Sequence, residues 1–75
     1  MPTIIRFGNV KIAMYPGDHN PPHFHLLTPD HAAIVSLATL EIIAGFVPRQ
    51  TYEMARAWAV DHMDELWSKW TDLNG

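Results

Sequence analysis

Short apolar runs alternate with turn residues over the first 45 residues, which is the pattern of antiparallel strands joined by tight turns. Two of these runs flank Gly8-Asn9, and a glycine at the first of two loop positions is typical of a type II′ hairpin turn. Pro16-Gly17 suits the centre of a type II turn, and Thr28-Pro29-Asp30-His31 is a further turn signal. Residues 40–45 suit either an edge strand or one helical turn, and we favour the strand. The pattern predicts a meander of four strands, or five with this last one.

A different periodicity begins after Pro48. From there to Trp70 the chain has no further Pro or Gly, and apolar side chains recur at three- and four-residue spacing. This predicts one amphipathic helix of about six turns within residues 48–72. The predicted fold class is α+β, with a four- to five-stranded antiparallel meander (residues 1–45) packed on one long C-terminal helix in a single domain (residues 1–75).

Alternation along the predicted strands assigns their side chains to two faces of the sheet. The apolar face expected beneath the helix consists of Val10, Ile12, Met14, Phe24, Leu26, Ala33, Val35 and Leu37. A single helix covers one side of a sheet, so the other face is left to water or to another chain. That second face is predicted to collect a polar and locally basic group, namely Arg6, Lys11, Tyr15, His23 and His25.

The segment Asp18-His19-Asn20-Pro21-Pro22-His23-Phe24-His25 holds three of the five histidines of the chain. Each proline fixes its own φ and pushes the preceding residue towards extended conformations, so a strand is expected to start near His23. In a strand, His23 and His25 point to one side and Phe24 points to the other. His19 is expected in the turn just before them.

This histidine group suits three different roles. His19, His23 and His25 can supply three nitrogens to a divalent metal ion, with a fourth position for water, although H-x3-H-x-H matches no familiar zinc motif. A histidine near Tyr15 and Arg6 has the acid, base and cation needed for metal-free RNA cleavage. The third role is an interaction surface on which the same groups form interface hydrogen bonds. We take these five residues as catalytic candidates and expect no bound cofactor, with a divalent ion as the alternative.

Composition limits the other functions. The chain has no cysteine, which excludes disulfides, thiolate metal ligands and a thiol nucleophile. Eight acidic side chains against five basic ones give a formal charge of −3, so RNA binding would have to depend on a local patch. The N-terminus does not resemble a signal peptide and no apolar run is long enough to span a bilayer, so we predict a cytoplasmic protein without a membrane partner.

The chain is rich in apolar residues for its size. They make up 48% of 75 residues, more than so small a domain can hide, so we expect a homo- or hetero-oligomer. Trp67 and Trp70 recur at helical spacing and suit core or interface anchors, and with Lys11 they are our candidates for partner binding. His62, one turn after Trp58, is predicted to be a buried histidine with a satisfied ring nitrogen, or else to reach the histidine group.

Several motifs together resemble a small bacterial family. They are Met1-Pro2-Thr3-Ile4, Met14-Tyr15 before a turn, the D-H-x-P-P-H-F-H segment, Gly45 followed by Val47-Pro48, and Trp58, His62, Glu65-Leu66 and Trp70 on the helix. The family is the domain of unknown function DUF4160, and the chain is similar to the DhiT-type proteins of type II toxin-antitoxin operons. The resemblance covers nearly the whole chain.

This resemblance implies a growth-inhibiting toxin that is neutralised by tight binding of a small cognate antitoxin encoded beside it. It brings no assigned active site, so the candidate residues depend on the chemistry described above. The competing function is a non-enzymatic module that binds a protein partner or regulates transcription or assembly with it.

Overall fold

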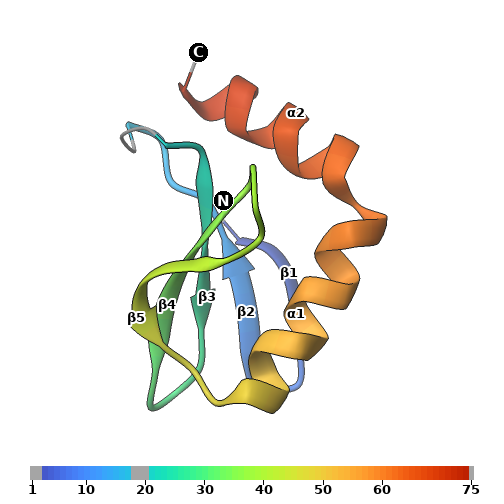
Figure 1. Cartoon of the computed structure of the whole chain (residues 1–75). Coiled ribbons are helices and arrows are strands. Elements are labelled where there is room, and N and C mark those ends of the chain that lie inside the picture. Colours follow the sequence, from blue (N-terminus) through green and yellow to red (C-terminus); the bar gives the residue numbers. More distant parts are fainter. Residues whose placement is uncertain (1–2, 18–20, 75) are drawn as a thin grey trace.

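The computed structural model describes residues 3–17 and 21–74, which form one five-stranded antiparallel sheet and two helices (Figure 1). Each strand pairs with its neighbours in chain order, so the sheet is a simple meander. The elements are β1 (Thr3–Phe7), β2 (Val10–Ala13), β3 (His23–Leu27), β4 (Ala32–Ser36), β5 (Ile42–Phe46), α1 (Arg49–Asp61) and α2 (Met63–Asn74). The predicted α+β meander is confirmed, including its fifth strand.

The first two turns follow their local sequence. Gly8 has φ +62, and Leu40 is the one non-glycine residue with positive φ in the described chain, so Asn9 has the negative φ that a type II′ turn requires. Gly17 has φ +82, as the second central position of a type II turn requires.

The prediction of one continuous helix over residues 48–72 is wrong in one respect, because the helix is divided at His62. The backbone of His62 leaves the helical region (φ −129, ψ 26), and its ring Nδ1 donates a hydrogen bond to the carbonyl oxygen of Trp58 at 2.7 Å. A side chain that bonds to the preceding turn competes with the backbone ladder, which accounts for the break. Figure 1 shows α1 and α2 meeting at an angle beside the sheet. Neither of these helices is both long enough and apolar enough to cross a bilayer.

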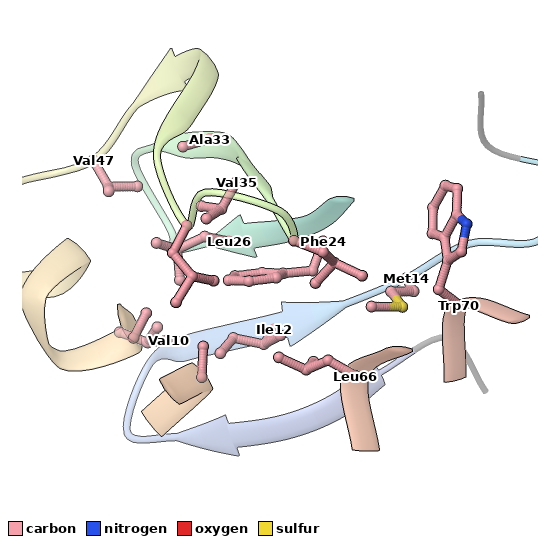
Figure 2. Packing of buried hydrophobic residues seen from close by; sticks show 14 residues of the cluster. Val10, Ile12, Met14, Phe24, Leu26, Ala33, Val35, Val47, Leu66 and Trp70 are labelled. Carbon is pink, nitrogen blue, oxygen red and sulfur yellow. The ribbon is translucent and has the colours of Figure 1, made fainter. Parts of the chain in front are cut away.

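The core lies between the sheet and the helices. All eight apolar side chains predicted beneath the helix are buried, and Ile12, Phe24 and Leu26 are fully enclosed. In Figure 2, Leu66 of α2 lies against Ile12, and Trp70 lies near Met14 at the end of the sheet. Burial of one large apolar side chain contributes roughly 1.5–3 kcal/mol, so this layer supplies most of the stability.

Strand β5 lies at one edge of the sheet and pairs irregularly with β4. Its pairing shifts by one residue between Ile34 and Val35 of β4, which marks a β-bulge in β5. Gly45 has φ +79, and a Cβ there would overlap the carbonyl oxygen of Ala32. Only glycine fits this position without moving a strand.

Candidate functional site

The register of the sheet places side chains in rows that cross all the strands. Arg6 is paired with Lys11, Lys11 with Leu27, Leu27 with Ala32, and Ala32 with Phe46. Residues that are directly paired point to the same side, so these five form one row. The row lies on the side of the sheet away from the core.

A second row on the same side runs beside the first. Ala13 is paired with His25, His25 with Ile34, and Ile34 with Ala44. His23, paired with Ser36, continues this side towards the end of the sheet. We call this surface the open face; it comprises Arg6, Lys11, Leu27, Ala32, Phe46, Ala13, His25, Ile34, Ala44, His23 and Ser36.

Aromatic rings form a continuous chain from the open face to helix α2. The rings of Tyr15 and His25 meet edge to face with centroids 4.8 Å apart, and those of His25 and His23 are 5.3 Å apart. The ring of His23 in turn lies 5.2 Å from that of Trp70. We call these four residues the ring cluster. It brings together three of the residues chosen from sequence as catalytic candidates.

The prolines help to fix His23. Its Nδ1 donates a hydrogen bond to the carbonyl oxygen of Pro21 at 2.7 Å, and only 8% of the residue is exposed. This bond sets the orientation of the ring at the start of β3. His25, two residues later, is half-buried on the open face and is therefore the more accessible of the two histidines.

The other candidate residues lie in different places. His19 lies outside the described residues, so the proposed metal triad stays a prediction; within residues 3–17 and 21–74 no cluster of three histidine or acidic side chains suits a metal ion. Arg6 is exposed on β1, two strand spacings or about 10 Å from the backbone of β3. It shares the open face with the ring cluster but belongs to another row. Trp67 is 39% exposed on α2, whereas Trp70 is only 8% exposed and packs within the core.

His62 contacts Trp58 at the helix break. Their rings stack with centroids 4.2 Å apart and an angle of 11° between their planes. Its ring nitrogen is satisfied, as predicted, but the residue is half-buried instead of buried. The role that the structure gives to His62 is therefore to end helix α1.

The open face also contains a shallow hollow of about 210 Å³ beside His25. Its other lining residues are small or aliphatic, namely Ala32, Ala33, Ile34, Ala44 and Gly45. Phe46 follows Gly45, is 64% exposed, and its ring contacts that of His31. Sequence reasoning missed this hollow. The available signal was that alanine and glycine occupy paired positions on two neighbouring strands, where they leave space.

Charge is distributed unevenly between the sheet and the helices. The five described strands contain no acidic residue, and their only lysine and arginine are Lys11 and Arg6, both on the open face. The helices carry the acidic residues Glu53, Asp61, Asp64, Glu65 and Asp72 against the basic residues Arg49, Arg56 and Lys69. The open face is therefore locally positive on a chain with a formal charge of −3.

One protein-family model matches residues 9–71 of the chain, and the family is described as a domain of unknown function (DUF4160). The match includes most of the open face and almost all of both helices. No curated protein and no solved structure matches the chain.

Proposed function

We propose that this chain, which belongs to the family of the domain of unknown function DUF4160, is a growth-inhibiting toxin of a type II toxin-antitoxin module. The open face is the active surface, and the antitoxin neutralises the toxin by covering it. The toxin role follows from the likeness of the motifs to DhiT-type proteins. The choice of surface follows from the geometry.

The observation that carries this proposal is the contact of Tyr15, His25 and His23 at one end of the open face, where Tyr15 and His25 are half-buried and Trp70 of α2 packs against His23. Beside these rings lie a hollow and the exposed ring of Phe46. A contiguous apolar surface next to oriented polar groups is typical of a binding site.

Within this proposal, the toxin acts by metal-free cleavage of RNA. A histidine such as His25 can take a proton from a 2′-hydroxyl group and return one to the leaving oxygen. Lys11 and Arg6 supply the positive charge that stabilises the negative charge developing on phosphate. The absence of acidic residues from the strands supports this role despite the negative charge of the whole chain.

The second candidate is a binding module without catalysis. It is favoured by the burial of His23, because a ring held by the Pro21 carbonyl and packed on Trp70 is well placed to support a surface. In this version the toxin acts by occupying a cellular protein through the open face.

Expression of the chain alone tests the proposal. We expect growth arrest with the unaltered chain and with His62→Ala, a control that removes a half-buried histidine at the helix break, outside the ring cluster and the open face. Loss of arrest in His25→Ala and in Tyr15→Phe, with circular dichroism unchanged, supports catalysis, because Tyr15→Phe keeps the ring and removes only the hydroxyl group. Arrest that survives both changes but is lost in Lys11→Glu supports the binding module. No arrest with the unaltered chain would contradict the toxin role.

A further inference from the structure

We infer that the open face receives an acidic amphipathic segment of the partner protein, which places one apolar side chain in the hollow and carboxylates on Lys11 and Arg6. The inference names the chemistry of the antitoxin and in that sense extends the proposed function. It depends on three separate observations.

The first observation is the size and lining of the hollow. At about 210 Å³ it is smaller than the roughly 300–1,000 Å³ of most small-molecule sites, and it is shallow. Apart from His25 its lining residues are Ala, Gly and Ile, which offer no polar side chain to orient a metabolite. A single large apolar side chain of a protein partner fits this chemistry, and the exposed Phe46 provides a further apolar contact.

The second observation is the pairing of two cations. Arg6 and Lys11 lie directly opposite each other on β1 and β2, on the same face. Like charges at paired positions of a sheet destabilise it. A carboxylate placed between them would relieve this repulsion, and the strands themselves supply none. The open face is thus complementary to an acidic surface.

The third observation is the spacing between these two features. Lys11 on β2 and Ala32 at the hollow on β4 belong to one row and are separated by two strand spacings, or about 10 Å. Arg6 on β1 lies one spacing further, at about 15 Å. On a helix these distances correspond to about seven and ten residues, which fall on one face of the helix. The partner segment should therefore carry acidic residues about seven and ten positions from its apolar anchor.

A second copy of the chain is the rival occupant, because its helices present an acidic surface. Packing of a helix face on a sheet face joins two different surfaces, so it would produce closed rings or open chains. Such chains would grow with protein concentration.

A display experiment with the full chain tests the inference. A library of random peptides of about 16 residues, long enough as helices to cross the sheet, is selected on the folded protein. We expect enriched peptides to carry acidic residues at the predicted spacing from an apolar residue. Their dissociation constants should rise at least about tenfold with Lys11→Glu and with Ala44→Leu, which fills the hollow. Lys69→Glu makes the same charge change on α2 and should alter binding less than about twofold.

Charge reversal gives the sharpest readout. A peptide whose acidic residues are changed to lysine should lose binding to the unaltered chain and regain it when Arg6→Glu and Lys11→Glu are combined. Enriched peptides without acidic residues, no enrichment at all, or equal effects of Lys11→Glu and Lys69→Glu would each overturn the inference. So would self-association of the unaltered chain that Lys11→Glu abolishes, since the occupant would then be a second copy. The growth assay is independent: peptide binding as expected without growth arrest would keep this inference and reject the toxin role.

Discussion

Replacing Gly45 with alanine tests whether the path of β5 beside β4 requires a residue without a Cβ. Gly45 has φ +79, and a Cβ at this position would lie 2.9 Å from the Cα of Ala33 and would overlap the carbonyl oxygen of Ala32. Both neighbours are backbone atoms, so they cannot rotate away as a side chain can. The methyl group can be accommodated only if β5 moves away from β4.

The magnitude can be separated into two parts because the chain contains two control glycines. Gly8 and Gly17 also have positive φ, but a Cβ at either would meet nothing within 4 Å. Gly8→Ala and Gly17→Ala should therefore lower the free energy of unfolding only by the cost of holding alanine in a left-handed conformation, about 1–2 kcal/mol. Gly45→Ala should add an overpacking cost of about 1–3 kcal/mol. A chain of this length is stable by about 4–11 kcal/mol, so the combined loss is a large part of the total.

Urea unfolding followed by tryptophan fluorescence measures these differences in the free energy of unfolding. In thermal melting, each kcal/mol of lost stability should lower the melting temperature by about 4–8 °C in a domain of this size. We expect the unaltered chain to be the most stable. Gly8→Ala and Gly17→Ala should be less stable, and Gly45→Ala should be the least stable. Equal midpoints for Gly45→Ala and the two controls would refute the reasoning, because the contact with Ala32 would then have no energetic effect.

Three other predictions concern the helices. Leu66→Ala should lower the free energy of unfolding by about 2–5 kcal/mol, while Trp67→Ala should lower it by less than about 1 kcal/mol; similar losses in urea unfolding would contradict the burial assigned to Leu66. Tyr52→Phe should lower the free energy of unfolding by about 0.5–1.5 kcal/mol in the same assay, because the Tyr52 hydroxyl group donates a 2.5 Å hydrogen bond to the carbonyl oxygen of Leu40 in the loop before β5. An unchanged midpoint would argue against that bond. His62→Ala should cost about 1 kcal/mol and change the fluorescence of Trp58, and an unaltered emission spectrum would speak against the stacked pair.

Local sequence predicted the sheet because its signals act over a few residues. Turn glycines at positions 8 and 17 take the positive φ that their turns need, and period-two alternation places the buried side chains correctly. The helix break was not predictable in this way. Ala55 and Ala59 are followed by Leu66 and Trp70 at spacings of four, seven and four, which a continuous helix would also give. The bond from His62 to a carbonyl leaves no trace in that pattern.

The parts of the candidate site that depend on one strand could be predicted from the sequence. The parts that depend on the arrangement of several elements were missed. The i and i+2 positions of His23 and His25 suffice to place them on one face. Tyr15 was predicted on the same face, but its contact with His25 depends on the register between β2 and β3, which the sequence did not predict. The hollow depends on the bulge and on Gly45 in β5, and Trp70 reaches His23 only because α2 crosses the end of the sheet. These features come from tertiary packing, which short sequence patterns do not predict.

The two edges of the sheet explain why recognition should use its face. Both edge strands carry a register shift. In β1 it lies between Thr3 and Ile5, and in β5 it lies opposite the step from Ile34 to Val35 of β4. Bulges disturb the regular row of backbone donors and acceptors that an added strand would need, and natural edges use them to prevent such pairing. Gly45, with its positive φ, distorts β5 further. Recognition by strand addition takes its affinity from the backbone groups of a regular edge, which the bulges disturb at both edges, whereas the open face offers two cations and one hollow at fixed spacing. The open face is therefore better suited than either edge to recognise one partner among other proteins.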